Sequence, residues 1–379
     1  MIAHRQMLPQ QRQSKREHRP VQIISFGILL LTTMMVYRQD YSKLSVFSNW
    51  YWDDTEAAQH PNVASTNTTL SMTLPGQYTL PPSQQQNSPN PVAWPNILVV
   101  YSGPASLTEG DPDKIQFYLR NLEFFLQHGI DCRSQETIIV LGHDVALLYQ
   151  ETIQQLDKSC YSHHRVTLIE RDNVCYDMET VRLVMHGNVT NLPILDYDYF
   201  FHVNCGTTGP VMPLNETHVP WTSKFIEKLV GNIKMVGISH VCERVMSHIQ
   251  SMVYALDKVG LQLIQKSSCV YDCRPFIDAL NNVSESAVVG SIINQYERGM
   301  GREILEQGYA IASLYRPKTL TKENQGNCTD KDMWLTTHLN EALGKIPSLG
   351  EVMFFKTSRI LTKETARLIN FTGNIWWNW

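Results

Sequence analysis

The sequence predicts an α/β fold in which a mostly parallel β-sheet is flanked by helices on both faces. From about residue 96 onward, short uninterrupted apolar runs alternate with longer segments whose apolar residues recur three and four positions apart. Short connections join these segments, and such alternation is typical of parallel strands linked by crossover helices. Residues 96–379 are also the only part of the chain that is long and mixed enough to bury a sizeable core.

The first half of this domain alternates regularly between the two patterns. Strands are predicted at 97–102, 137–141, 165–169 and 199–203. Helices are predicted between them at 114–128, 145–156 and 176–185. In the second half we expect strands at 234–239 and 351–355, and helices from about 247 to 265 and from about 288 to 307.

Residues 21–37 predict a membrane anchor. They carry no charge, and as a helix rising about 1.5 Å per residue they reach roughly 25 Å. Residues 1–20 hold five basic side chains against one acid, so we expect a cytoplasmic tail and a single-pass type II topology. The alternative is a cleaved signal peptide. It would usually have a shorter apolar core and a small-residue cleavage site, whereas Tyr37-Arg-Gln-Asp-Tyr41 follows here.

The composition of residues 38–95, which are rich in Ser, Thr, Asn, Gln and Pro, predicts a disordered stem. We expect the domain beyond it, 96–379, in the lumen of the Golgi apparatus or the endoplasmic reticulum. Six N-x-Ser/Thr acceptor sites follow the anchor, where chance would give roughly three. Eight cysteines follow the stem and allow disulfides, while zinc is disfavoured because no Cys-x2-Cys pair occurs. The acceptor sites are Asn67, Asn188, Asn215, Asn282, Asn327 and Asn370, and the cysteines are Cys132, Cys160, Cys175, Cys205, Cys242, Cys269, Cys273 and Cys328.

The overall charge argues against a nucleic-acid partner. The chain is 43% hydrophobic and 18% charged, with a formal net charge of −4. A domain that binds a polyanion is usually clearly basic. We therefore expect no nucleic-acid partner for this chain.

The predicted sheet also indicates where a ligand binds. In open α/β sheets, ligands bind beyond the carboxyl ends of the strands, where the strand order reverses. The residues that directly follow the predicted strands are Ser102, Asp172, Asn173 and the small-residue loop 204–210. Glycines in that loop allow a phosphate or a sugar to approach the backbone closely. An ordinary tight turn is the alternative reading of the same loop.

The order of these segments resembles nucleotide-sugar glycosyltransferases of the GT-A type. Within that fold it is most similar to the rhamnan synthesis F family and related algal and plant type II membrane proteins. The resemblance spans Ile97 to Lys356 and implies transfer of a hexosyl or deoxyhexosyl group from a nucleotide-sugar donor to a glycan or glycoprotein acceptor. The segments that carry it are Tyr199-Phe-Phe-His-Val-Asn-Cys-Gly-Thr-Thr-Gly-Pro-Val-Met-Pro213, Trp221, Val236-Gly-Ile238, His248-Ile-Gln-Ser-Met252, Tyr296-Glu297 with Leu305 and Gly308-Tyr309, and Glu351-Val-x-Phe-x-Lys356.

The resemblance also implies roles for individual residues. Glu297 would be the catalytic base, although a solvated helix carboxylate is the alternative. Asp172 and Asn173 could instead cap the helix that follows them, and His248 could be a surface or satisfied core histidine. The implied donor-binding residues are Ser102, Asp172, Asn173, Asp177, Asn204, Gly206 and Gly209, and those on the acceptor or donor side are Trp221, His248, Gln250 and Lys356.

One departure from the family's pattern concerns the metal. Most GT-A enzymes hold a divalent ion with Asp-x-Asp at the end of the fourth strand, where this chain has Asn204-Cys-Gly206. Asp196-Tyr-Asp198 is expected at the beginning of that strand, on the opposite edge of the sheet. Dependence on Mn2+ or Mg2+ therefore stays open. So does a second function, that of a membrane-tethered carbohydrate-binding or scaffolding protein with the same fold and no turnover.

Overall fold

The computed structural model describes residues 95–108, 110–160, 165–186, 192–212, 216, 219–241, 247–267, 285–315, 318–324 and 353–356. The chain divides into two compact units, Met1–Asn67 and Thr68–Trp379, and every described residue belongs to the second. The predicted tail, the anchor at 21–37 and the stem at 38–95 lie outside the described residues, apart from residue 95 itself. Among the helices that the structure does describe, none is long and apolar enough to cross a membrane.

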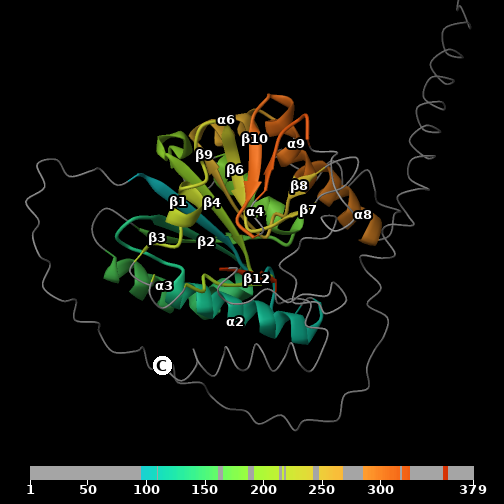
Figure 1. The fold of residues 1–379 in the computed structure, drawn as a ribbon. Helices are drawn as coiled ribbons and strands as arrows, with labels where there is room; N and C mark the ends of the chain where they lie inside the picture. Colours follow the sequence, from blue (N-terminus) through green and yellow to red (C-terminus); the bar gives the residue numbers. More distant parts are fainter. Residues whose placement is uncertain are drawn as a thin grey trace, which may run out of the picture. The chain divides into compact units, whose positions relative to one another are not determined.

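An eight-stranded sheet forms the centre of this unit, in the order β11-β10-β6-β9-β4-β1-β2-β3 (Figure 1). Strands β1, β2, β3 and β4 run parallel to one another, and β6 runs parallel to β10. Strand β9 is antiparallel to both β4 and β6, and β11 is antiparallel to β10. The prediction of a mostly parallel sheet is therefore confirmed. The strands of this sheet are β1 (Ile97–Ser102), β2 (Glu136–Gly142), β3 (Val166–Arg171), β4 (Tyr199–Asn204), β6 (Ile233–Gly237), β9 (Val253–Asp257), β10 (Ala310–Ser313) and β11 (Thr319–Leu320).

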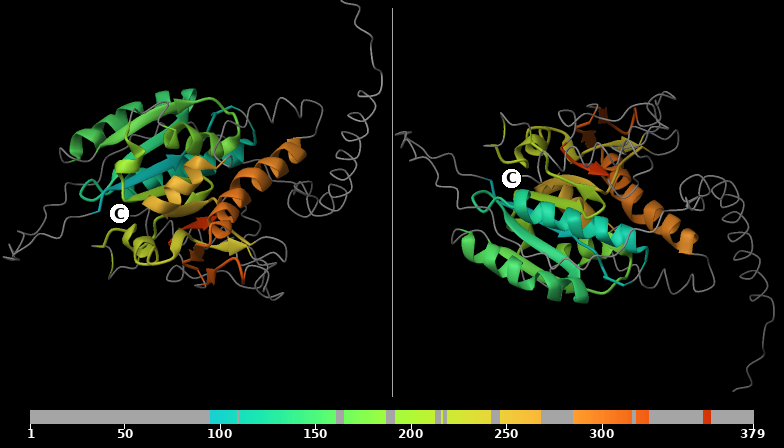
Figure 2. Two further views of the ribbon diagram at one scale, coloured as in Figure 1. Left: turned by 90° about the horizontal axis from the view of Figure 1, so that it is seen from above. Right: turned by 90° about the horizontal axis from the view of Figure 1, so that it is seen from below.

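Helices cover both faces of the sheet, and a hydrophobic core lies against each face (Figure 2). Alternate residues of each strand point to opposite faces, so Leu98 and Val100 belong to one core and Val99 and Tyr101 to the other. The first core is closed by α4, α6 and α9, and the second by α2, α3 and α5. The helices are α2 (Pro112–His128), α3 (His143–Ser159), α4 (Tyr176–Met185), α5 (Ser223–Ile226), α6 (Lys258–Lys266), α8 (Glu285–Ile292) and α9 (Arg298–Glu306), with a short 3-10 turn η1 (Ile194–Asp196) and a π-helical turn η4 (Ile293–Glu297) between α8 and α9.

The expected helix at 247–265 is wrong over its first half. The chain instead forms the short strand β8 (His248–Ile249), paired with β7 (His240–Val241), and then the central strand β9. A helix begins only after Asp257, whose carboxylate accepts a hydrogen bond from the backbone N–H of Gly260 at 2.8 Å and caps α6. The helix predicted at 288–307 is confirmed as the run α8, η4 and α9.

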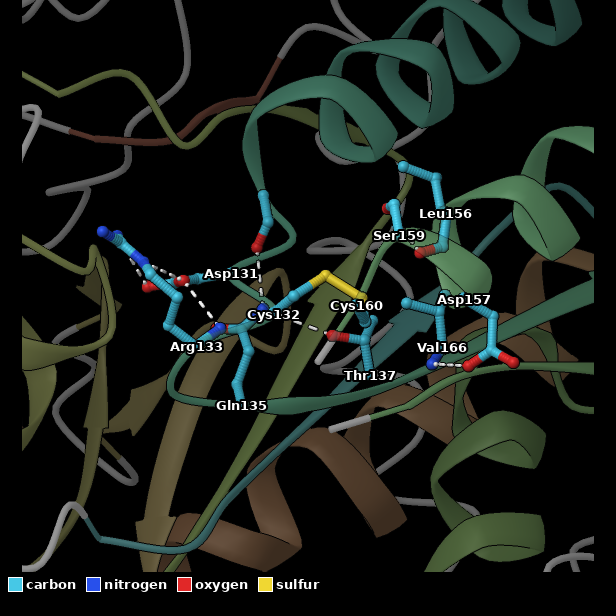
Figure 3. Close-up of a disulfide and its surroundings, with 11 residues drawn as sticks. Asp131, Cys132, Arg133, Gln135, Thr137, Leu156, Asp157, Ser159, Cys160 and Val166 are labelled. Carbon is cyan, nitrogen blue, oxygen red and sulfur yellow. Dashed lines mark hydrogen bonds and ion pairs between the residues drawn. A yellow bond between two sulfur atoms is a disulfide. The ribbon is translucent and has the colours of Figure 1, made fainter. Parts of the chain in front are cut away.

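The cysteine content allows disulfides, and the described residues contain a bond between two of the eight cysteines. Cys132, in the loop after α2, bonds to Cys160 at the end of α3, with 4.8 Å between their Cα atoms (Figure 3). Asp131 organises the same loop by accepting hydrogen bonds from Arg133 and Ser134. The disulfide joins two helices on one face of the sheet and lies far along the chain from the loop at 204–210.

Candidate functional site

The carboxyl ends of β1, β3 and β4 place three polar residues along one edge of the sheet. Ser102, Arg171 and Asn204 are the last residues of these strands. Ser102 and Asn204 are direct neighbours in the parallel pair. The Ser102 hydroxyl donates to the backbone oxygen of Asp177 at 3.4 Å, so the first turn of α4 lies over this edge. The ends of these parallel strands therefore lie at one edge, and the binding of a ligand there stays a prediction.

Asn204 connects the loop that follows β4 with helix α4. Its Nδ2 donates to Asp177 Oδ2 at 2.5 Å, and its Oδ1 accepts the Gly206 N–H at 2.5 Å. The orientation of the amide follows from its partners, because the Gly206 N–H requires an acceptor and the Asp177 carboxylate requires a donor. Thr207 donates its hydroxyl to the Asn204 carbonyl at 2.7 Å and closes the turn. Asn204, Gly206 and Asp177 therefore form one hydrogen-bonded unit.

The start of helix α4 has an unusual backbone. Cys175 and Tyr176 both have positive φ angles, 56° and 55°, although neither is glycine. Non-glycine residues in this left-handed region cost energy and cluster at functional sites. Cys175 occupies the cap position without a side-chain cap bond, so the alternative in which Asp172 or Asn173 caps α4 is wrong. Both of these residues are exposed and lie just before the helix.

Glu297 reaches the same edge from the π-helical turn η4. Its Oε1 accepts the backbone N–H of Ser251 at 3.0 Å. Burial raises the pKa of Glu297, and the nearby Asp177 charge raises it further, while the Ser251 N–H and the Lys356 ammonium act in the opposite direction. A carboxylate with a raised pKa is suited to accept a proton near neutral pH. The alternative of a fully solvated carboxylate is not what the structure shows.

The segment at 353–356 packs across the loop after β4. Strand β12 (Phe355–Lys356) pairs antiparallel with β5 (Thr207–Thr208), which places Lys356 beside Thr207. A side chain at Gly209 would collide with this segment, because a Cβ there would lie 2.5 Å from the Met353 carbonyl oxygen. Gly209 therefore serves the close approach of two backbone segments. Lys356 interacts electrostatically with Glu297, so a cation borders the site.

Three further polar residues near this edge were not identified from the sequence. They are Arg171, His202 and Tyr254, and each is buried with one polar atom lacking a hydrogen-bond partner among the described residues: Arg171 Nε, His202 Nε2 and Tyr254 OH. His202 and Tyr254 are cross-strand neighbours on β4 and β9, with ring centroids 5.2 Å apart. A histidine inside an otherwise apolar strand was a signal that could have found His202. Tyr254 was missed because the sequence predicted a helix, and not a strand, for its segment.

The charge state of His202 follows from its contacts. Its Nδ1 lies 3.1 Å from the Ser251 carbonyl oxygen, which only accepts, so Nδ1 carries the proton and Nε2 presents a lone pair. Burial lowers the pKa of His202, Arg171 lowers it further, and Asp177 opposes both. Ser251 thus links a neutral imidazole, through its carbonyl, to the Glu297 carboxylate, through its N–H.

The structure places three predicted site residues within the core. The indole N–H of Trp221 donates to the Gly129 carbonyl at 2.9 Å, and its ring packs edge-on against Phe201, Phe225 and Phe354. Gln250 is buried, and its Oε1 accepts from the Ser239 hydroxyl at 2.6 Å. His248 is buried in β8 rather than at the start of a helix. We therefore leave these three residues out of the proposed site.

The residues at the end of β4 do not fit a divalent cation. Such an ion prefers several carboxylate oxygens, but Asn204 already uses its amide oxygen for Gly206 and its nitrogen for Asp177. Across the described residues, no three His, Cys, Asp or Glu side chains come together to hold a metal. Asp196 and Asp198 lie at the beginning of β4, at the opposite edge, where Asp198 accepts the Asn96 N–H at 2.9 Å. We derive no step through a metal ion.

Comparison with known proteins gives only distant likenesses. No family model matches the chain, and no curated protein matches it. Among solved structures, a mannosyltransferase from Pyrobaculum calidifontis in complex with GDP-Man and Mn2+ is 11% identical with a TM-score of 0.32, over 60% of this chain and 56% of that one. Mouse xyloside xylosyltransferase 1 is 8% identical with a TM-score of 0.27, over 56% of this chain and 79% of that one.

A third solved structure is a similarly distant likeness. The 4-diphosphocytidyl-2C-methyl-D-erythritol synthase from Anaerococcus prevotii is 12% identical with a TM-score of 0.26, over 54% of this chain and 84% of that one. The chain spans little more than half the length of the mannosyltransferase. At this level of likeness, the chemistry has to be argued from the site itself.

Proposed function

We propose that this chain transfers a sugar from a nucleotide-sugar donor to a glycan or glycoprotein acceptor at the carboxyl edge of its sheet. The observation that carries the proposal is the meeting of a partly buried carboxylate of raised pKa, Glu297, with the Asp177–Asn204 pair at the end of β4. The resemblance of the segment order to GT-A glycosyltransferases supports the same reading. The transferred group in this proposal is a hexosyl or deoxyhexosyl group.

The residues divide into a donor side and an acceptor side. The loop from Asn204 to Gly209, together with Ser102 and the first turn of α4, offers small residues and backbone N–H groups to the donor. Glu297 faces the site from the other side. In an inverting transfer, the acceptor hydroxyl oxygen bonds to the anomeric carbon, the bond to the diphosphate oxygen breaks, and Glu297 takes the hydroxyl proton. Exposed Asp172 and Asn173 border the donor side.

We also propose that the domain lies in the lumen of the Golgi apparatus or the endoplasmic reticulum, behind a single-pass type II anchor at 21–37. The uncharged span after a basic tail supports the orientation. The Cys132–Cys160 disulfide supports an oxidising compartment, because such bonds rarely persist in the cytosol. The membrane would then be a partner of the full chain.

A second candidate function is binding without turnover. Asn204 stands where most GT-A enzymes carry a metal-binding carboxylate, and its amide oxygen and nitrogen already hold one hydrogen bond each, with Gly206 and Asp177. A membrane-tethered carbohydrate-binding or scaffolding protein that kept the fold would have this property. Such a protein would bind a glycan and would leave every nucleotide-sugar intact.

A screen of nucleotide-sugars with the purified full-length chain separates these functions. Release of the nucleoside diphosphate and transfer to a glycan mixture would be measured with Mn2+ and with EDTA. We expect turnover of at least one donor by the wild type and its loss in Glu297→Gln, which removes a base without removing volume. Glycan binding with no release of nucleoside diphosphate from any donor would support the scaffolding function instead.

A further inference from the structure

Arg171 is a buried cation without an ion pair among the described residues, although the charges of Asp177 and Glu179 act on it from a distance. It ends strand β3 and is 9% exposed. Its Nη1 donates to its neighbour's carbonyl, Asp172 O, at 3.3 Å, and its Nη2 donates to Gly103 O at the long distance of 3.5 Å. Its Nε has no hydrogen-bond partner among the described residues, and no ion pair joins the guanidinium to a carboxylate there. A guanidinium offers five N–H donors, so most of this capacity is unused.

A second, mostly buried arginine shows how the same fold treats a structural charge. Arg182 on α4 forms a bidentate ion pair with Glu179, with Nε–Oε2 at 2.7 Å and Nη2–Oε1 at 2.6 Å. Neither side chain of this pair is more than 12% exposed. An unpaired buried charge is costly, and native structures pair such charges or use them to hold a ligand. The contrast between the two arginines therefore indicates that the Arg171 guanidinium has donors left for an anion from outside the chain, besides the more distant charges of Asp177 and Glu179.

The position of Arg171 fits an anion at the carboxyl edge. Its guanidinium lies under the turn after β1, where Gly103 packs so closely that a Cβ would stand 2.1 Å from a side-chain carbon of Leu141. The end of β2 is equally tight, since a Cβ at Gly142 would stand 1.8 Å from the Ala105 carbonyl oxygen. These two glycines bring the turn down onto the strand ends and let Arg171 reach across β2 toward the Ser102 edge.

We propose that Arg171 is the cation of a diphosphate-binding site and neutralises the donor's diphosphate without a divalent ion. The identification of the diphosphate with that of a sugar donor rests on the proposed function, whereas the anion site rests on Arg171 itself. A planar guanidinium binds phosphate oxygens bidentately, which a point charge does not. Lys356, on the other side of the loop after β4, supplies a second positive charge at the same edge.

The test measures binding of inorganic pyrophosphate to the full-length chain by calorimetry in the presence of EDTA. We expect the wild type to bind pyrophosphate more tightly than sulfate. Arg171→Gln and Arg171→Met are expected to weaken pyrophosphate binding at least tenfold, with a melting temperature no lower than that of the wild type. Arg171→Lys keeps the charge and loses the planar guanidinium. Its affinity for pyrophosphate should therefore lie between that of the wild type and that of Arg171→Gln. Arg182→Gln is the matched control, because it breaks the paired arginine and should lower the melting temperature while leaving the affinity of folded protein unchanged.

Several results would overturn the assignment. They are wild-type affinity in Arg171→Gln, binding by the wild type only when Mn2+ is present, equal affinity for sulfate, or unfolding of both the Gln and Met variants, which would make the charge structural. The proposed function fails separately. If pyrophosphate binds through Arg171 but no nucleotide-sugar is consumed, the anion site stands and sugar transfer does not. If sugar is transferred and Arg171→Gln binds pyrophosphate as tightly as the wild type, sugar transfer stands and the anion site at Arg171 does not.

Discussion

Replacing Asn204 with Asp tests the central hydrogen bond of the candidate site. In the wild type, Asn204 Nδ2 donates to Asp177 Oδ2 at 2.5 Å. The substitution keeps the size of the side chain and the acceptor for Gly206, but it sets two carboxylates at hydrogen-bond distance. Two charges about 4 Å apart near a protein surface repel by about 4 kcal/mol. One carboxyl of the pair therefore takes up a proton when protonation costs less than this repulsion.

The cost of that proton sets the magnitude and its pH dependence. Each pKa unit is worth about 1.36 kcal/mol, so protonating an Asp of ordinary pKa near 3.9 costs about 4 kcal/mol at pH 7 and about 1.5 kcal/mol at pH 5. The pKa of one carboxyl is then higher in the folded variant than in its unfolded chain. A raised folded-state pKa of an acid means that stability is lost as pH rises, and it is recovered as pH falls. Asn204→Asp should therefore approach wild-type stability at pH 5.

The assay is the free energy of unfolding in urea at pH 5 and pH 7, with EDTA and with Mn2+. Mn2+ should stabilise Asn204→Asp, by about 2.7 kcal/mol at a hundredfold excess over its dissociation constant, and should leave the wild type unchanged. Asn204→Leu is the control: it loses both hydrogen bonds, worth together about 2–4 kcal/mol, at either pH and with no response to Mn2+. An Asn204→Asp variant as stable as the wild type at pH 7 in EDTA would refute the contact between Asn204 and Asp177.

Three further predictions concern catalysis, the disulfide and topology. Because the pKa of Glu297 is raised, we expect the rate of transfer to increase as pH rises through a value above 4.5. Glu297→Gln should lower kcat and abolish this pH dependence without changing the affinity for pyrophosphate. An unchanged kcat would show that Glu297 is not the catalytic base. Replacing Cys132 and Cys160 with Ser opens a link of sequence separation 28 and should cost about 3–4 kcal/mol in unfolding free energy, measured in urea with the reduced wild type as control; equal stability would mean that the bond is absent in solution. Intact microsomes should protect the domain at 96–379 from protease, and endoglycosidase should reduce the mass of the full chain through sites that include Asn67 in the stem; digestion of the domain would contradict the proposed orientation.

The elements that the sequence predicts best are those whose local pattern agrees with their tertiary setting. Strands β1, β2 and β4 are apolar runs, and both of their faces are buried in the structure. The segment at 247–265 shows the opposite case. Its apolar spacing fits a helix, but Val253–Asp257 fills the gap between β4 and β6, and that pairing outweighs the helical period. The local sequence pattern does not predict such a pairing between distant strands.

The candidate site was predictable where it depends on strand ends and not where it depends on contacts across strands. Ser102 and Asn204 follow from the position of β1 and β4 alone. Arg171 and Tyr254 could not be found in this way, because their importance lies in what surrounds them: burial without a partner for Arg171 Nε and Tyr254 OH.

The departures from ordinary local structure argue for a functional site. The left-handed residues at the start of α4, the π-helical turn that ends at Glu297, and the unpartnered atoms of Arg171 and His202 each cost stability. Arg171, Cys175 and Tyr176 lie close together along the chain, while His202 and Glu297 come from distant segments, yet Arg171, His202 and Glu297 all interact electrostatically with Asp177. Violations of this kind are expected where function competes with folding, and a purely structural core would have paired these groups or replaced them with apolar ones.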